Sequence, residues 1–111
     1  MDTIAHYREL VKQVITAHAQ HKPVFGDVRI ETIFDETQDH YELIHVGWDG
    51  LIRVEGAVIH IDILDGKIWI QHDGTEHGVT RELEALGVPR QAIVLGFHAP
   101  AKRPLTDYAV G

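Results

Sequence analysis

The sequence contains no cysteine and no serine. Without cysteine the chain has no disulfide bond, no thiolate zinc ligand and no cysteine nucleophile. Without serine, only threonine could supply a hydroxyl nucleophile for hydrolysis, and none of the threonines stands in a nucleophile-elbow motif. The first residues lack the basic start and apolar run of a secretion signal, and no apolar run approaches the roughly 18 residues needed to span a bilayer. The sequence therefore predicts a cytoplasmic protein with no membrane association.

Basic residues are also few, because 10 Lys and Arg stand against 17 Asp and Glu, giving a net charge of −7. The acidic residues concentrate over 27–49, which holds seven acids and one base, whereas 90–106 holds three bases and no acid. A DNA-binding domain gains most of its affinity by neutralising phosphates with a basic face. We therefore expect no high-affinity DNA binding by this chain alone.

The remaining composition is that of an ordinary globular protein, with 44% hydrophobic and 24% charged residues. A chain of 111 residues is long enough for one core and too short for two, so we expect a single domain over 1–111. Residues 4–18 predict an amphipathic helix with Asp2 as its N-cap, which Pro23 prevents from continuing. The residues spaced for its apolar face are Ile4, Tyr7, Val11, Val14, Ile15 and His18.

The middle of the chain changes to a strand pattern over 28–34, 40–48, 51–64 and 67–71. Asp49-Gly50 and Asp65-Gly66 stand between β-branched and aromatic runs, which predicts two-residue hairpin turns. Val79, Leu83 and Gly87 then predict a short second helix, and 93–97 a short strand before a tail that packs on the body through Leu105, Tyr108 and Val110. We therefore predict an α+β fold: an N-terminal helix, an antiparallel four-stranded meander, a second short helix, a short C-terminal strand and a packed tail.

The second turn also predicts which side chains share a face. With Asp65 and Gly66 in the turn, Asp62 lies opposite Trp69, His60 opposite Gln71 and Ile59 opposite His72. A change of phase near Glu55-Gly56 indicates a β-bulge. The core face consists of Ile59, Ile61, Ile63, Ile68 and Ile70, and the outer face of His60, Asp62, Lys67, Trp69 and Gln71.

Nine histidines raise the question of a metal site. His60 and Asp62 share a face at a spacing of two, but no motif in the sequence supplies the third ligand that a catalytic metal needs. The other pairs, His72 with Asp73 and His18 with His21, lack a third ligand in the same way. We therefore assign no catalytic residue, no metal ligand and no cofactor from the residues alone.

An acidic-then-lysine pattern, Asp62, Asp65 and Lys67, superficially resembles that of metal-dependent nucleases, but the hairpin turn explains it better. An outward-facing tryptophan amid polar residues is typical of an interface centre, and a C-terminal tail covering that face is an equally good explanation. The candidate interaction surface predicted from the sequence consists of His60, Asp62, Lys67, Trp69, Gln71, Lys102 and Arg103.

Three long stretches, in order, resemble the XisI family: 40–48, 58–71 and 87–98. The resemblance covers essentially the whole chain. XisI proteins are controlling factors for excision of the fdxN element in filamentous cyanobacteria. The resemblance implies a non-catalytic accessory role, in which the protein acts with an XisH partner and permits a separate recombinase to remove a DNA element during heterocyst development. It supplies no catalytic or ligand-binding residue.

Two classes of function follow from the sequence. In the first, the chain is a regulatory module, a homodimer, whose acid-rich segment binds a basic surface of an XisH-like protein; an antitoxin-like inhibitor of a nuclease-like partner would share these features. In the second, it is a small metal-dependent or ligand-binding enzyme that uses His60 and Asp62. Stoichiometric metal in the purified protein would favour the second class.

Overall fold

The fold, taken from a computed structural model, is described for residues 3–21, 23 and 25–111. Asp2, the expected N-cap, lies outside these residues. A long helix, α1 (Thr3–Ala19), precedes four strands, β1 (Asp27–Asp35), β2 (His40–Asp49), β3 (Ile52–Leu64) and β4 (Lys67–Asp73). A short helix, α2 (Val79–Ala85), leads to β5 (Ile93–Leu95), and 3₁₀ turns occupy Arg90–Ala92 and Arg103–Leu105. The predicted α+β class is therefore confirmed.

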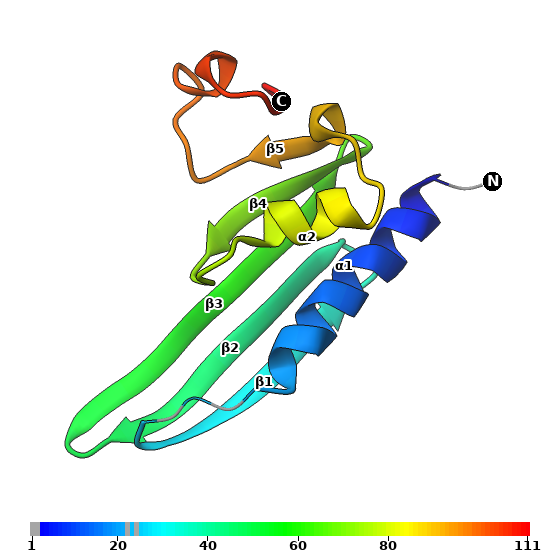
Figure 1. The fold of residues 1–111 in the computed structure, drawn as a ribbon. Coiled ribbons are helices and arrows are strands. Elements are labelled where there is room, and N and C mark those ends of the chain that lie inside the picture. Colours follow the sequence, from blue (N-terminus) through cyan, green and yellow to red (C-terminus); the bar gives the residue numbers. More distant parts are fainter. Residues whose placement is uncertain (1–2, 22, 24) are drawn as a thin grey trace.

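The five strands form one sheet in the order β1-β2-β3-β4-β5, with both helices on the same face (Figure 1). The first four strands are the antiparallel meander that the sequence predicts. β5 joins the same sheet parallel to β4, because α2 carries the chain back across the sheet between them. None of the helices in the described part of the chain is long and apolar enough to cross a membrane.

The core lies between the sheet and the helices. The five isoleucines of the predicted core face, on β3 and β4, are all buried, and α1 contributes Tyr7, Leu10, Val11, Val14 and Ile15. α2 ends as Gly87 predicts. This residue has φ 99°, and the amides of Gly87 and Val88 donate to the carbonyls of Glu84 and Leu83, which is a Schellman motif.

The hairpin at Asp65-Gly66 is confirmed, because both residues have positive φ and Asp62 lies opposite Trp69. The first turn was placed one residue too early. Asp49 pairs with Ile52, so the turn residues are Gly50 and Leu51. Gly50, with φ 62°, occupies the first central position, which a type II′ turn reserves for glycine.

Two bulges correct the predicted register. In β3 the extra residue is Val58 rather than Glu55-Gly56, because Leu43 pairs with Ile59 and Ile44 with Ala57. In β4 the extra residue is Gln71, so that His60 lies opposite His72 and not Gln71. By the same shift Ile59 lies opposite Asp73, not His72.

The tail packs less completely than the sequence predicts. Ala109 is buried and its amide donates to the Ile93 carbonyl at 2.8 Å, and Tyr108 packs against the core. Leu105 and Val110 are instead 86% and 57% exposed. The strand expected over 93–97 stops at Leu95, and Phe97 is exposed.

Candidate functional site

The candidate site lies on the face of the sheet that the helices leave uncovered. Side chains alternate along a strand, so the residues between the core isoleucines point to this face. The strand register brings His40 of β2 directly opposite Asp62 of β3, and Asp62 opposite Trp69 of β4. We call this uncovered side the open face.

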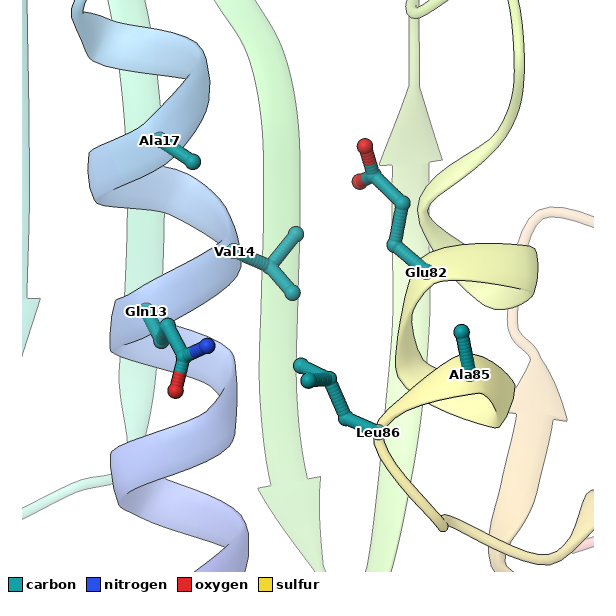
Figure 2. A pocket seen from close by; sticks show the side chains of 6 residues that line it. All are labelled: Gln13, Val14, Ala17, Glu82, Ala85 and Leu86. Atoms are coloured by element: carbon teal, nitrogen blue, oxygen red, sulfur yellow. The ribbon is translucent and has the colours of Figure 1, made fainter.

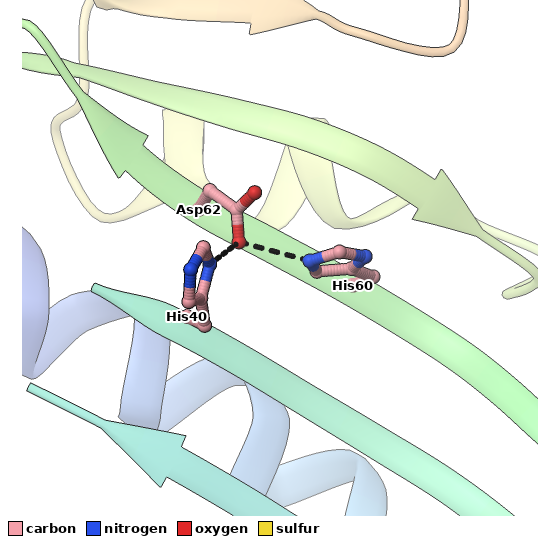
Figure 3. A group of neighbouring side chains, drawn as sticks. All are labelled: His40, His60 and Asp62. Atoms are coloured by element: carbon pink, nitrogen blue, oxygen red, sulfur yellow. Dashed lines mark hydrogen bonds and ion pairs between the residues drawn. The ribbon is translucent and has the colours of Figure 1, made fainter. Parts of the chain in front are cut away.

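Asp62 is the centre of the site. It is the only charged residue among the described ones that is buried. Its Oδ1 atom accepts from His40 Nδ1 at 2.7 Å and from His60 Nε2 at 2.9 Å (Figure 3). Its Oδ2 atom accepts from Gln71 Nε2 at 3.2 Å. A buried carboxylate is stable only when it is hydrogen-bonded, and here both oxygens are.

The histidines differ in exposure and surroundings. The His40 side chain is about half exposed, and its hydrogen bond to Asp62, reinforced by the charge of that carboxylate, raises the pKa of His40 above its usual 6.5. His60 is less exposed, and its second nitrogen, Nδ1, lies 3.7 Å from Glu42 Oε1. Each imidazole therefore directs one nitrogen to the same carboxylate oxygen.

The two bulges explain why these side chains meet. Asp49 of β2 pairs with Ile52 of β3, and from that pair a regular ladder without a bulge would bring Ile61 opposite His40. The extra residue Val58 shifts β3 by one position, so that Asp62 lies opposite His40 instead. The bulge also keeps Ile59 and Ile61 in the core while His60 and Asp62 point outward. In β4 the extra Gln71 reaches back to Asp62. Bulges often re-aim side chains next to functional sites.

The residues of the predicted interaction surface thus form two separate groups, of which the first is His60, Asp62 and Gln71. Sequence reasoning placed His60, Asp62 and Gln71 correctly on one face, but it missed His40 and Glu42. The pairing of β2 with β3 would have revealed both residues, because it places them beside His60 and Asp62. That pairing can be predicted only if the bulge at Val58 is known.

The second part of the predicted surface is Trp69 with Arg103. The Arg103 guanidinium carbon lies 5.1 Å from the Trp69 ring centroid, and its Nε donates to the His98 carbonyl at 3.1 Å. Trp69 is half-buried beneath this part of the tail, so tail cover explains at least part of its environment. Lys67 lies beside the hairpin turn and Lys102 is exposed just before the second 3₁₀ turn. The role of the seven residues in an interface stays a prediction.

The acidic segment 27–49 divides between the two sides of the sheet. At the β1–β2 turn, Asp39 accepts from Arg8 Nε at 2.8 Å and Glu36 from Lys12 at 2.6 Å, which ties this turn to α1. The bond from Arg8 lowers the pKa of Asp39. The register places four further acids of β1 and β2 on the open face with His40, namely Asp27, Glu31, Asp35 and Glu42, and Asp49 on the other side. Arg29 lies among the four and pairs with Glu31 at 3.2 Å.

A separate groove of about 260 Å³ lies on the other side of the sheet, between α1 and α2 (Figure 2). His18 of α1 and Glu82 of α2 join its two walls through contacts of 2.8 and 3.0 Å from Nε2 to the carboxylate oxygens. The side chains that line the groove are Gln13, Val14, Ala17, Glu82, Ala85 and Leu86. The groove is mainly apolar and lacks the convergent polar groups of a catalytic pocket among the residues described.

The fold and these contacts define a class of small α+β domain with one sheet face packed by helices and the other open, with acidic residues in excess and a His–Asp–His cluster at its centre. The chain belongs to the XisI family: the family model described as XisI protein matches residues 1–110. No curated protein sequence matches the chain.

Two solved structures from Anabaena variabilis ATCC 29413 are similar to this chain. One is a XisI-like protein with 46% sequence identity and a TM-score of 0.91, where the match covers 96% of this chain and 98% of the other. The second is the fdxN element excision controlling factor XisI, with 35% identity and a TM-score of 0.86, covering 99% and 100% of the two chains. The resemblance inferred from the sequence is confirmed over the whole chain.

Proposed function

We propose that this chain is a non-catalytic regulatory factor that controls excision of a DNA element of the fdxN type by a separate recombinase. In this role it acts through an XisH-like protein rather than on DNA directly. The name of the solved relative, an excision controlling factor, supports the regulatory role. The observation that carries the proposal is the open face, where the acidic side chains of β1 and β2 outnumber the one basic side chain of these strands, Arg29.

The register also places Arg29 and Arg53 on this face, with Arg53 5.2 Å from the Trp48 ring centroid, so its acids are in excess rather than alone. A surface with an excess of acids favours a basic partner. Asp27 and Glu31 are exposed on this face, and Trp48 beside them is 50% exposed. Acidic residues around an exposed aromatic side chain supply both steering and an anchor for a basic protein surface. A protein surface that faces DNA is basic because it neutralises phosphates, so we propose the DNA-facing side of an XisH-like protein as the surface that this chain binds.

Binding to such a surface would also suit an antitoxin-like inhibitor, which would block a nuclease-like partner by occupying its DNA-binding side. Both roles require a basic partner surface, but the inhibitor would lower the DNA cleavage activity of its partner whereas the accessory factor would support it. The DNA cleavage rate of the partner, measured with and without this chain, separates inhibition from assistance.

The experiment that tests the proposal is co-purification of this chain with an XisH-like protein from the same organism. We expect a stable complex, which Glu31→Lys weakens by placing a like charge against the basic partner. Glu76→Lys is the matched control, because it makes the same charge change at an exposed loop position before α2. The absence of a complex, or equal weakening by both variants, would contradict the proposal.

The second class, a small metal-dependent enzyme that uses His60 and Asp62, gains one favourable observation, because His40 completes a set of three potential ligands. A bound metal alone would not establish catalysis, since metals also have structural roles. The regulatory proposal therefore remains the function that the structure and family support best.

A further inference from the structure

We propose that His40, His60 and Asp62 form a binding site for one divalent transition-metal ion, with Zn²⁺ as the best-suited ion. This inference goes beyond the regulatory function and is independent of it, because it concerns the chain without any partner. The nitrogen and oxygen atoms that would bind the ion all lie within 4.8 Å of one another. Figure 3 shows both imidazoles directed at the Asp62 carboxylate from β2 and β3.

The ligand types fit a borderline cation. Two imidazoles and one carboxylate suit Zn²⁺ and other first-row metals, whereas Mg²⁺ and Ca²⁺ prefer oxygen ligands alone. Three protein ligands with an open fourth position are also the usual arrangement of zinc sites that retain a water. The half-exposed His40 side chain leaves the site accessible from solvent.

The distances from the two histidine nitrogens to Asp62 Oδ1 require only a small adjustment. Bonds of about 2.0–2.2 Å to Zn²⁺ place tetrahedral ligand atoms roughly 3.3 Å apart. The two nitrogens lie 2.7 and 2.9 Å from Asp62 Oδ1, so each must move away by about half an ångström. On binding, the ion takes the place of the proton between each nitrogen and the oxygen. A neutral imidazole then carries its proton on the other ring nitrogen, whereas an imidazolium releases one proton to solvent.

The surrounding groups hold the ligands in the orientations that a metal needs. Gln71 Nε2 donates to Asp62 Oδ2, so that Oδ1 remains directed at the histidines. Glu42 lies on the far side of the His60 ring, 3.7 Å from Nδ1, within ion-pair range but beyond hydrogen-bond distance, while Nε2 faces the site. A carboxylate behind a ligating histidine fixes its tautomer and raises its basicity, and it is a recurring feature of zinc sites.

The charge of the site also favours a cation. With neutral imidazoles the three ligands carry one negative charge, and Glu42 adds a second close by. A divalent ion would balance both. Arg103, which lies over this face, is engaged with Trp69 and the His98 carbonyl rather than with Asp62.

The test is a titration of the tag-free full chain, after treatment with a chelator, with Zn²⁺ and separately with Co²⁺. We expect one equivalent of Zn²⁺ bound, and Co²⁺ visible absorption bands of a four- or five-coordinate site with nitrogen and oxygen ligands. His60→Gln and Asp62→Asn should each abolish stoichiometric binding. Glu42→Gln should weaken it by roughly 10–100-fold, as is typical of a group behind a metal ligand.

The matched control is His6→Gln, which makes the same substitution at an exposed position of α1. It should leave the stoichiometry and affinity unchanged. Thermal melts without metal show whether each variant is folded, and His40→Gln, at a half-exposed position, tests the same site if His60→Gln is unstable. No stoichiometric uptake of either metal, or uptake that survives His40→Gln and Asp62→Asn, would overturn the proposal without affecting the regulatory function.

Discussion

Arg103 lies over the ring of Trp69, with 5.1 Å between the guanidinium carbon and the ring centroid. The indole Nε1 is buried and has no hydrogen-bond partner among the described residues. The ring is therefore held by packing and by a cation–π contact rather than by a polar bond. This contact fixes the loop after β5 against the open face of the sheet.

This arrangement predicts different consequences for Trp69→Ala and Ile61→Ala. Ile61 is fully buried, so its loss should lower the free energy of unfolding by about 2–5 kcal/mol. Trp69 is half-buried, and its loss should cost about 1–3 kcal/mol. Trp69→Ala should also free the tail, which hydrogen exchange at the Ala109 amide would detect well below the denaturant midpoint.

Trp48→Ala is the control for this comparison, because Trp48 is 50% exposed at the other end of the same face. It should leave exchange in the tail unaltered. If Trp69→Ala leaves the Ala109 amide fully protected, Trp69 does not hold the tail, and its main role becomes that of an interface residue.

A second prediction compares two glycines. A Cβ atom at Gly47 of β2 would lie 2.1 Å from the Asp27 carbonyl oxygen and 2.7 Å from Val28 Cα on β1, whereas nothing lies within 4 Å of one at Gly56 of β3. Gly47→Ala should therefore destabilise the fold by about 1–3 kcal/mol, because β1 must move away. Gly56→Ala should be neutral or stabilise the fold by up to about 1 kcal/mol, through a less flexible unfolded chain.

Chemical denaturation of the two glycine variants measures this difference, and circular dichroism confirms that both retain the fold. Equal stabilities for the two variants would show that β1 adjusts at no cost. The contact at Gly47 would then have no role in the β1–β2 pairing.

The features that the sequence predicts well are those with local causes. The Asp65-Gly66 turn, the end of α2 at Gly87 and the isoleucine face each depend on residues close together in the chain. The His40–Asp62 contact depends on an extra residue, Val58, whose position in the ladder has no strong local signal. The cover of Trp69 by Arg103 joins residues 34 positions apart and likewise requires the folded tail.

A third prediction concerns oligomeric state. The open face includes Trp48, half exposed beside β1 at the edge of the sheet, and small proteins usually bury such a surface in a two-fold dimer. Sedimentation equilibrium should give twice the mass of the chain, and Trp48→Lys should give a single chain. Leu105→Lys, at an 86% exposed position in the tail, should remain dimeric. A single-chain mass for the unaltered protein at high concentration would contradict this prediction.

A fourth prediction concerns DNA. The net charge of −7 and the acids of the open face leave little basic surface to displace counterions. In fluorescence anisotropy with duplex DNA at physiological salt, the chain alone should bind weakly and without sequence preference. Submicromolar, sequence-selective binding would contradict it and would move the proposed role from a protein partner to DNA.

The last prediction follows from Glu84, which joins three segments at the edge of the sheet. Its carboxylate accepts from Arg90 Nε and, at 3.1 Å, from the Tyr108 hydroxyl of the tail, and Arg90 also contacts Asp107. The hydrogen bond from Arg90 lowers the pKa of Glu84 below its usual 4.5. A carboxylate with a lowered pKa in the folded state stabilises the protein above the unfolded pKa, and this contribution disappears as the pH falls through the folded pKa.

A double-mutant cycle with Glu84→Gln, Arg90→Gln and the double variant isolates this pair from the other acids. Urea unfolding should show a favourable coupling between the two residues at neutral pH. The coupling should diminish once the pH falls below about 4.5 and vanish where Glu84 is protonated in the folded state. Added salt should also reduce it, because both side chains are partly exposed. A coupling that does not change with pH would show that the Glu84 charge does not stabilise this junction, and that packing of Tyr108 alone holds the tail to α2.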